Sequence, residues 1–212
     1  MKATKYASLG FVMLGIAACA NVERSRNLND PNVTAKSMAQ QVCSACHGVD
    51  GNSISPNFPN LAGQTELYMI SQLKEFRNHS RSDPAGFEYM WGLSRHLTDE
   101  QVSGLASYFS GQTLRPVQTG DVQVIAGKKI FESGVPEKNI PACVSCHGDN
   151  GQGKDQTPRL AGQHADYLVK QLSVFQRTDK RPDGAVMKII AHDLTEANKI
   201  DVAAYLQVMG PK

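Results

Sequence analysis

The sequence predicts an all-α fold built from two tandem copies of one small domain. Three observations lead to this prediction. Apolar residues recur at helical spacing in several segments, no run of β-branched residues supplies a convincing strand, and parts of the chain align with later parts without gaps. The length of 212 residues suits one large or two small domains. An apolar content of 41% with 20% charged residues is ordinary for a globular protein.

The internal repeat is the strongest of these observations. Residues 59–79 (PNLAGQTELYMISQLKEFRNH) align with residues 158–178 (PRLAGQHADYLVKQLSVFQRT), and nine of 21 positions are identical. Residues 87–99 align with residues 184–196 and share a Met, a Leu and a Thr. Both copies follow the same order of helices, loops and motifs. Duplication of one domain is therefore the simplest account.

The domain boundaries follow from this repeat and from composition. We expect a first domain at 34–111 and a second at 122–212. Residues 112–121 contain Gly, Pro and polar residues and form the expected linker.

Individual helices can be placed in chain order. They are expected ahead of the first cysteine motif, around Tyr68–Phe76, from Thr98 to Gly111, around Ala126–Phe131, around Tyr167–Phe175, and from Thr195 to Gly210. Thr98 and Gln101 have the spacing of a capping box, and Gly111 is a stop signal. Thr195 opens the matching helix of the second copy, which ends at Gly210-Pro211.

The N-terminus has the pattern of an export signal. Lys2 and Lys5 precede a short apolar run, Leu9–Ala18, which is shorter than the roughly 20 residues that span a bilayer. Residues 1–19 are therefore predicted to be a signal peptide, which implies a periplasmic protein. No later stretch is long and apolar enough to span a membrane.

The cysteine at the end of this run allows two interpretations. Ile16-Ala17-Ala18-Cys19 resembles a lipoprotein box, in which Cys19 becomes the lipidated first residue of the mature chain. Cleavage after Ala20 also satisfies the small-x-small rule of ordinary signal peptides. We favour lipidation, because it explains an otherwise unpaired cysteine in an exported protein. The polar residues 20–33 would then form a tether to the membrane.

The charge balance excludes some partners. The formal net charge is +2, and no Lys/Arg-rich run or nucleic-acid motif is present, so we expect no nucleic-acid partner. Residues 32–112 carry five basic and seven acidic side chains, whereas residues 121–212 carry twelve and eleven. The first domain is the more acidic of the two, and this difference could orient a docking partner.

The motif Cys-x-x-Cys-His-Gly occurs twice and uses four of the five cysteines. On a helical turn Cys43, Cys46 and His47 converge on one side, and the same holds for residues 143–147 (CVSCH). Two thiols and an imidazole so placed suit a redox disulfide, half of a zinc site, or covalent haem attachment. In haem attachment each thiol adds to one porphyrin vinyl group, and the His binds the iron.

Covalent haem is the interpretation that the rest of the chain favours. A redox disulfide of the thioredoxin kind expects a βαβ setting, which this sequence does not supply. Zinc usually takes four N or S ligands, and each motif offers three. His79 and His164, the nearest spare histidines, occupy different places in the two copies. A covalent haem would also supply the apolar core that domains of this small size lack.

A second axial ligand decides what such a haem can do. Met90 and Met187 are the candidates, because each lies seven residues ahead of the Leu-Thr that opens the last helix of its copy. A thioether ligand saturates the iron and raises its potential, whereas an open position would allow small molecules to react. Met38, Met69 and Met209 have no Met partner in the other copy and are interpreted as core residues. His96 and His192 do not align with each other and are expected on the surface.

Pro59 and Pro158 recur ahead of the second helix of each copy. A metal-bound His gives its other N–H to a fixed acceptor, and a carbonyl held by a rigid proline would serve. A turn-forming proline without this role is the alternative, and the residues alone favour it.

These residues together resemble class I cytochromes c, and specifically the two-haem cytochrome c4 family. The resemblance covers about residues 34–212 and rests on the two Cys-x-x-Cys-His-Gly motifs, the two Pro-x-Leu-Ala-Gly-Gln segments, and a Met before each Leu-Thr helix. It implies two pseudo-twofold-related domains, each wrapped around one covalent haem c with its iron. The implied site residues are Cys43, Cys46, Cys143 and Cys146 as haem attachments, His47, Met90, His147 and Met187 as iron ligands, Pro59 and Pro158 as carbonyl acceptors for the ligand histidines, and Leu61 and Leu160 as further cofactor contacts.

The resemblance also implies a function. Members of this family carry single electrons in the periplasm, so the partners would be redox proteins of a respiratory chain. A membrane cytochrome complex would be the donor, and an oxidase or reductase the acceptor. This sequence departs from the family in having Ser94 where Ala is common four residues after the axial Met, as at Ala191. A lipid anchor at Cys19, the only membrane attachment we expect, would also be atypical.

Two alternatives belong to other functional classes. The chain could be the two-haem subunit of a larger dehydrogenase such as a flavocytochrome, because such subunits share this repeat. A peroxidase-type enzyme needs an open or displaceable axial position, and the matching methionines argue against it. The sequence therefore predicts an electron carrier and not an enzyme.

Overall fold

A computed structural model of the protein describes residues 26–84, 86–115, 124–177 and 179–210. The predicted signal peptide, Cys19, the first part of the tether, and residues 116–121 of the linker lie outside these ranges. Within them the chain is helical, and the only β-structure is two isolated bridges, Val135–Ile140 and Lys154–Thr157. The predicted all-α class is confirmed.

The first lobe is the copy that ends at α6. Its elements, in chain order, are α2 (Ala35–Met38), η1 (Ala39–Cys43), α3 (Ser44–His47), α4 (Glu66–Arg77), η2 (Gly86–Met90), α5 (Trp91–Ser94) and α6 (Asp99–Ser110). Helix α6 packs against both α2 and α4. Two of the elements, η1 and η2, are π-helices. The haem-motif helix α3 directly follows η1, and the predicted axial ligand Met90 is the last residue of η2.

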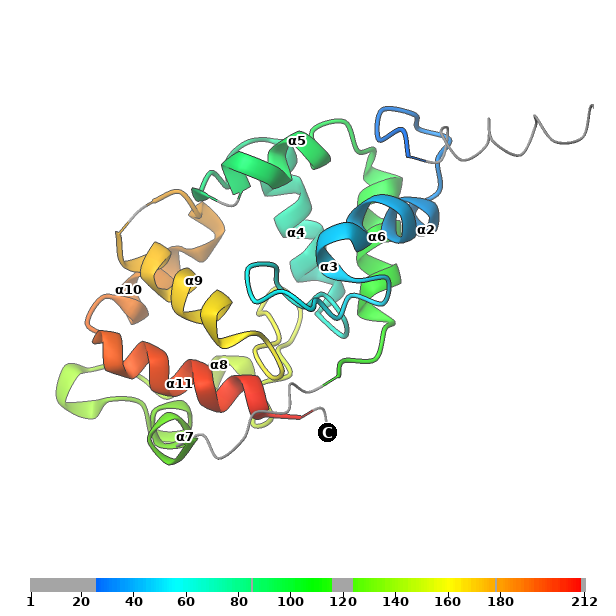
Figure 1. The fold of residues 1–212 in the computed structure, drawn as a ribbon. Helices are drawn as coiled ribbons and strands as arrows, with labels where there is room; N and C mark the ends of the chain where they lie inside the picture. Colours follow the sequence, from blue (N-terminus) through cyan, green and yellow to red (C-terminus); the bar gives the residue numbers. More distant parts are fainter. Residues whose placement is uncertain (1–25, 85, 116–123, 178, 211–212) are drawn as a thin grey trace, which may run out of the picture.

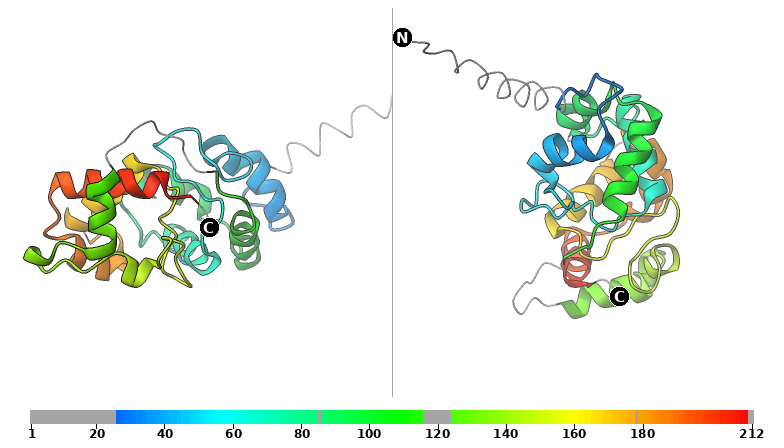
Figure 2. Two further views of the ribbon diagram at one scale, coloured as in Figure 1. Left: turned by 90° about the horizontal axis from the view of Figure 1, so that it is seen from below. Right: turned by 90° about the vertical axis from the view of Figure 1, so that its right-hand side faces the viewer.

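The second lobe repeats this plan with different connections. Its elements are α7 (Val124–Ser133), η3 (Pro136–Lys138), α8 (Val144–His147), α9 (Ala165–Arg177), η4 (Pro182–Gly184), α10 (Ala185–Ala191) and α11 (Glu196–Val208). Helix α11 packs against α7 and α9, as α6 packs against α2 and α4. In Figure 1 the two groups of helices occupy opposite sides of the molecule, and Figure 2 shows the same division from below.

Each lobe has a hydrophobic core of its own. Buried residues of α2, α4 and α6, including Met38, Met69 and Phe109, form one cluster. A separate cluster in the second lobe includes Phe131, Phe175 and Leu206 from α7, α9 and α11. The assignment of Met38 and Met69 to the core is confirmed, since they are 0% and 6% exposed.

The last helix of each lobe begins with the predicted side-chain cap. The hydroxyl of Thr98 accepts from the backbone N–H of Gln101, whose amide oxygen in turn accepts from the N–H of Thr98. Thr195 and Asn198 make the same reciprocal pair at α11. Such capping boxes satisfy two of the N–H groups that a helix start leaves without partners.

The predicted tether is too long at its C-terminal end. Val33 is 8% exposed and belongs to the core of the first lobe, with Leu28 packed against it. The amide of Gln101 also donates to the carbonyls of Asp30 and Val33, at 3.0 Å each. Pattern reading missed this, because the segment is polar apart from two apolar residues that dock on α6. No described helix is long and apolar enough to cross a membrane.

The first part of the predicted linker is likewise packed. Leu114 is 5% exposed. Asn52 donates to the carbonyl of Thr113 and accepts from the N–H of Arg115, at 3.0 and 2.8 Å. Residues 112–115 are therefore packed and not part of a free linker: Asn52 of the first lobe binds Thr113 and Arg115, and Leu114 lies against Gly162 of the second lobe.

Candidate functional site

A single cavity of about 750 Å³ runs through both lobes and contains every predicted haem-site residue of the described chain. The residues predicted in the first lobe that line it are Cys43, Cys46, His47, Pro59, Leu61 and Met90, and those in the second lobe are Cys143, Cys146, His147, Pro158, Leu160 and Met187. The structure thus brings together residues that lie more than forty positions apart in each copy.

Short helices present each Cys-x-x-Cys-His motif to the cavity. Cys46 and His47 lie in α3, and Cys43 directly precedes that helix. The motif glycine that follows, Gly48, has φ 77° and ψ 153°, a backbone region that is essentially restricted to glycine. A Cβ at Gly48 would lie 2.4 Å from the carbonyl oxygen of Asn52. The glycine of the motif therefore ends the helix and lets the loop turn back beneath it.

The two motif histidines are buried and oriented by proline carbonyls. His47 is 8% exposed and its Nδ1 lies 2.9 Å from the carbonyl oxygen of Pro59. His147 is 6% exposed and its Nδ1 lies 2.9 Å from the carbonyl oxygen of Pro158. A carbonyl can only accept, so Nδ1 carries the proton and Nε2 keeps its lone pair. This is the tautomer that an Nε2 metal ligand needs.

Burial sets the protonation of the motif residues. It lowers the pKa of His47 and His147, although their hydrogen bonds to the proline carbonyls act the other way. Both imidazoles are therefore neutral. Burial also raises the pKa of the Cys43 and Cys143 thiols to about 11, against a smaller lowering by backbone hydrogen bonds. Thiols of this kind are poorly ionised and do not suit a redox disulfide.

The zinc alternative also lacks support in the geometry. Among the described residues, no three His, Cys, Asp or Glu side chains are arranged to hold a metal ion. His79 and His164, the spare histidines, have other surroundings. The ring of His79 stacks on Phe87 and lies tilted 5.0 Å from the ring of Trp91, and Nε2 of His164 contacts the carbonyl oxygen of Ser53 at 3.0 Å.

The two predicted axial methionines line the cavity and are partly buried. Met90 ends η2, and Met187 lies within α10, where it packs against the core of the second lobe. His96 and His192 are exposed, as predicted. Leu61 and Leu160 line the same cavity and pack against the cores of their own lobes.

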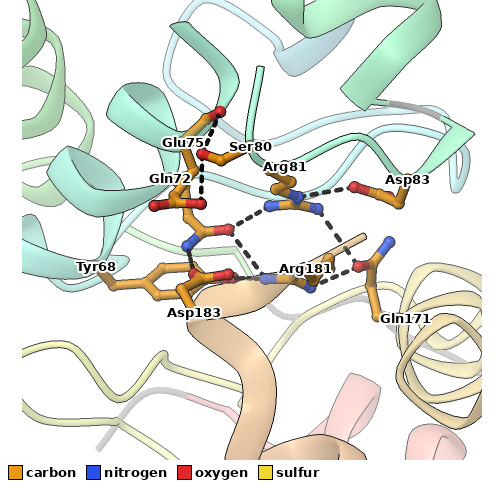
Figure 3. Close-up of polar contacts among 9 residues, drawn as sticks. All are labelled: Tyr68, Gln72, Glu75, Ser80, Arg81, Asp83, Gln171, Arg181 and Asp183. Atoms are coloured by element: carbon orange, nitrogen blue, oxygen red, sulfur yellow. Dashed lines mark hydrogen bonds and ion pairs between the residues drawn. The ribbon is translucent and has the colours of Figure 1, made fainter. Parts of the chain in front are cut away.

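Between the lobes, two buried arginines lie side by side among polar side chains (Figure 3). Arg81 is 4% exposed and donates to Asp83 at 2.9 Å and to Gln171 of the other lobe at 3.3 Å. Arg181 is 6% exposed and donates to Gln72 of the first lobe at 2.9 Å. Each arginine also donates to the glutamine of its own lobe. The network ties α4 to α9 across the pseudo-twofold axis.

This network leaves donors that fit the acidic edge of a haem. Nε of Arg181 and Nε2 of Gln171 are buried and have no hydrogen-bond partner among the described residues, and both residues line the cavity. A haem combines a broad apolar plane with two carboxylates. The cavity offers apolar walls, two thiols and an imidazole in each lobe, with unsatisfied N–H groups between the lobes. The residues present therefore fit two covalent haems.

Residue patterns did not single out the polar side chains between the lobes. Arg81 and Arg181 belong to two Arg-x-Asp triplets that lie just where the ungapped alignment of the repeats breaks. Gln64 and Gln163 were visible only as part of the repeated Pro-x-Leu-Ala-Gly-Gln segment. The recurrence of a polar triplet in both copies was the available signal.

Comparison with known proteins agrees with this geometry. The sequence profile of the cytochrome c family matches the chain twice, at residues 33–112 and 124–209. The chain belongs to the cytochrome c family. Its relatives place it among the two-haem cytochromes of the c4 type, and it carries two covalently bound c-type haems.

Three similar proteins illustrate this placement within the cytochrome c family. Cytochrome c-552 of Acidithiobacillus ferridurans is 36% identical over 205 residues, which cover 95% of this chain and 88% of that protein. Cytochrome c4 of Stutzerimonas stutzeri is 38% identical over 175 residues, covering 78% and 83%. The solved structure of Acidithiobacillus ferrooxidans cytochrome c4 has a TM-score of 0.74 at 40% identity, covering 78% of this chain and 97% of that one. The chain is thus an electron-transfer protein, as cytochromes of the c4 type are.

A further relative has a more specific name. The thiosulfate dehydrogenase electron acceptor of Stutzerimonas stutzeri is 34% identical over 185 residues, covering 82% of each chain.

Proposed function

We propose that this cytochrome is a periplasmic carrier in which each lobe holds one haem between a proximal His and a distal Met. In this assignment Cys43, Cys46, Cys143 and Cys146 form the thioethers, His47 and His147 are the proximal ligands, and Met90 and Met187 are the distal ligands. The observation that carries it is the recurrence of one geometry, with a His Nδ1 2.9 Å from a proline carbonyl beside a Cys pair in both lobes.

The chain's own residues explain why such a site transfers electrons instead of binding substrates. When bound, a haem with His and Met ligands supplies a saturated iron that changes oxidation state by one electron. The proline carbonyls fix the tautomer of the imidazoles, and the buried apolar walls keep water away. A thioether ligand favours the reduced state and so raises the potential. Each site can then take one electron from a donor and give it to an acceptor.

The division of labour between the domains belongs to this proposal. We assign one haem to the first lobe, the predicted domain 34–111 together with the packed residues 28–33 and 112–115, and the other to the second lobe, the predicted domain 122–212. The separate hydrophobic clusters of the two lobes support this assignment, because each has the first cysteine of one motif packed against it, Cys43 in the first lobe and Cys143 in the second.

The partners we propose are a membrane cytochrome complex as donor and a respiratory oxidase or reductase as acceptor. The first lobe exposes aromatic side chains beside Met90, with Phe87 and Tyr89 59% and 56% exposed. The second lobe exposes aliphatic ones, Val186 and Ile189, in the matching segment. Two different apolar surfaces, one in the more acidic half of the chain, suit two different partners.

Localisation at the periplasmic face follows from the predicted signal sequence, and Cys19 is the proposed lipid attachment. Cys19→Ser should release the protein from membranes with its haem spectrum unchanged, because one lipid-modified residue would provide the whole anchor. Intact-mass analysis of the mature chain checks this. A mature N-terminus at Asn21 without lipid mass would limit Cys19 to the signal peptide.

A second candidate function is that of a dedicated haem subunit for a dehydrogenase. The relative named as a thiosulfate dehydrogenase electron acceptor favours this alternative. Reduction of the purified protein by a dehydrogenase with its substrate, together with co-purification of the two, would support it. Fast reduction by a membrane cytochrome complex, without a co-purifying dehydrogenase, would favour the carrier.

The central assignment can be tested by removing one attachment site at a time. Cys43→Ser/Cys46→Ser and Cys143→Ser/Cys146→Ser should each leave one covalent haem, seen as half the mass gain over the apoprotein. The quadruple variant should carry none. Retention of two covalent haems in either double variant would contradict the assignment.

A further inference from the structure

The two Pro-x-Leu-Ala-Gly-Gln loops clasp each other across the lobe interface through their glutamines. Gln64 and Gln163 are 7% and 6% exposed. The amide oxygen of Gln163 accepts from the backbone N–H of Asn60 at 2.8 Å, and its amide nitrogen donates to the carbonyl of Asn60 at 2.9 Å. Gln64 makes the same two contacts with Arg159, at 2.6 and 3.0 Å.

These contacts involve the same peptide groups that orient the motif histidines. The carbonyl of Pro59 and the N–H of Asn60 belong to one planar peptide unit. Its oxygen accepts from His47 of the first lobe, and its N–H donates to Gln163 of the second lobe. The peptide between Pro158 and Arg159 has the equivalent arrangement in the second lobe.

In that second peptide the oxygen accepts from His147, and the N–H donates to Gln64 of the first lobe. Each lobe therefore contains a hydrogen-bonded chain that starts at its own histidine, passes through one peptide group, and ends on a glutamine of the other lobe. The two chains obey the pseudo-twofold symmetry of the fold.

Hydrogen bonds in such a chain are coupled. An acceptor on the N–H of a peptide polarises the group and makes its carbonyl oxygen a better acceptor. A better acceptor draws the Nδ1 proton of the histidine more strongly, which makes Nε2 a more basic ligand. A more basic ligand stabilises the oxidised iron, so loss of the glutamine oxygen should raise the reduction potential at that histidine.

We propose that Gln163 and Gln64 are positioning residues that act across the lobe boundary, each tuning the potential of the haem in the opposite lobe. This inference rests on the proposed ligand roles of His47 and His147. It assigns the interface a role in electron transfer beyond holding two lobes together, because changing one lobe's glutamine changes the other lobe's redox equilibrium.

The amide groups of both glutamines are well supplied with partners, which keeps them in place. The oxygen of Gln64 also accepts from the N–H of Thr65 at 2.9 Å, and that of Gln163 from the N–H of His164 at 3.0 Å. Each amide oxygen therefore receives two N–H groups, one from its own lobe and one from the other. A buried amide with three hydrogen bonds has little freedom to rotate away from the peptide group that it contacts.

The test uses the full two-haem protein and measures the two potentials separately. Hyperfine-shifted proton resonances of the haem methyl groups, assigned to each lobe, are followed through a redox titration. Gln163→Met removes the acceptor at Asn60, and Gln64→Met removes the acceptor at Arg159. We expect each to change the oxidised-to-reduced ratio of the opposite haem about threefold, or roughly 30 mV at 59 mV per tenfold change, toward the reduced form.

The crossed pattern is what separates this role from a structural one. Gln163→Met should shift the haem bound through His47 and leave the other within error, and Gln64→Met should do the reverse. His164→Ala serves as the matched control, because it removes a buried cross-lobe contact with Ser53 but touches neither peptide. We expect no crossed shift in this control.

Two further points keep the outcome decisive. Gln163→Asn retains the amide but is one methylene shorter, so it should reproduce the shift if the Met variant folds poorly. Equal shifts at both haems, a shift in the same lobe, or none at all would overturn the inference. Failure of the proposed function would be seen separately, in the unmutated protein. If its haem spectra lacked the signatures of histidine and methionine ligation, the proposed ligands themselves would be wrong.

Discussion

The two lobes share one plan but reach the haem motif by different routes. In the first lobe α2 continues through the π-helix η1 directly into α3. In the second lobe α7 ends at Ser133, and a loop containing η3 intervenes before α8. Even so, the His-to-proline distance is 2.9 Å in both. The hydrogen bond that orients the motif histidine is therefore the same in both lobes, although the segment that leads to the motif differs.

A second contrast lies in the cores. Val102 on α6 is 0% exposed, and the position that corresponds to it on α11 is Lys199, 2% exposed. Nζ of Lys199 donates to Ser173 at 2.7 Å and to Gln176 at 3.0 Å, and it pairs with Glu196 at 2.7 Å. A buried ammonium group is tolerated there because its three donors are satisfied.

The largest effect should come from exchanging these two residues. In the first repeat the positions of Ser173 and Gln176 are occupied by Lys74 and Arg77, which cannot accept hydrogen bonds. The carboxylate at the position of Glu196, Asp99, is already paired with Arg77. Val102→Lys should therefore lower the free energy of unfolding by about 3–5 kcal/mol, because it buries a charge without hydrogen-bond acceptors of its own. Chemical denaturation of the two-haem protein measures this.

The reciprocal exchange should be mild. Lys199→Val removes a charge together with its desolvation cost, and leaves Ser173, Gln176 and the exposed Glu196 each without one hydrogen-bond donor, so the free energy of unfolding should change by no more than about 1–2 kcal/mol. If both exchanges lowered the free energy of unfolding equally, the partners of Lys199 would not explain why a buried lysine is tolerated in the second lobe.

The axial methionines give the next largest effect. Met90→Ala and Met187→Ala should each remove about half of the near-infrared band of Met–iron ligation and lower one potential on the order of 0.1–0.2 V, within the roughly 0.8 V that axial ligands span. Met187 also packs against the core of its lobe. Met187→Ala should therefore cost more stability, which thermal unfolding of the two variants can compare. An unchanged band in either variant would assign the ligand elsewhere.

The motif glycines offer a smaller and sharper comparison. Gly48 and Gly148 have φ values of 77° and 81°. A Cβ at Gly48 would meet the backbone oxygen of Asn52 at 2.4 Å, whereas one at Gly148 would meet the side chain of Gln152 at 2.4 Å. The Gln152 side chain can rotate away, but backbone cannot.

Alanine at either glycine should cost about 1–3 kcal/mol of backbone strain. Gly48→Ala should be the worse of the two, and denaturation midpoints of the paired variants measure the difference. A larger loss for Gly148→Ala would show that the backbone contact at Asn52 yields more easily than expected.

Much of the fold and the candidate site could be predicted from local pattern. The capping boxes at Thr98 and Thr195, the buried Met38 and the lining role of the Cys-x-x-Cys-His motifs depend on residues close together in sequence. The contacts between lobes could not be predicted in this way. The partners Gln163 and Asn60 lie more than a hundred positions apart, and no periodicity encodes which loop faces which.

The prediction of a tether at residues 20–33 was wrong at its C-terminal end for a related reason. Polar composition predicts a tether, but the burial of Leu28 and Val33 depends on the core of the first lobe, which forms only when distant segments come together. The π-helices were not predicted either, because one extra residue in a turn hardly changes the spacing of apolar residues.

The smallest effect concerns the residue four positions after each methionine. Ser94 is 1% exposed, and its hydroxyl donates to the carbonyl of Met90 at 2.7 Å, whereas Ala191 in the second lobe has no hydroxyl. A serine that bonds back to the residue four positions earlier tends to bend a helix slightly. Ser94 ends α5 and bonds back to Met90, the residue at which the π-helix η2 meets α5, so its hydroxyl restrains the backbone that carries Met90.

Ser94→Ala should therefore move the potential of the first haem slightly and cost at most about 1 kcal/mol of stability, the usual net value of one hydrogen bond. Ala191→Ser places the same hydroxyl within reach of the Met187 carbonyl and should shift the second haem by a similar small amount in the opposite direction. Redox titrations of the two single variants and of the double exchange check this. Since the sites lie in different lobes, their effects should add, and a strongly non-additive double variant would mean that the distal segments are coupled through the interface.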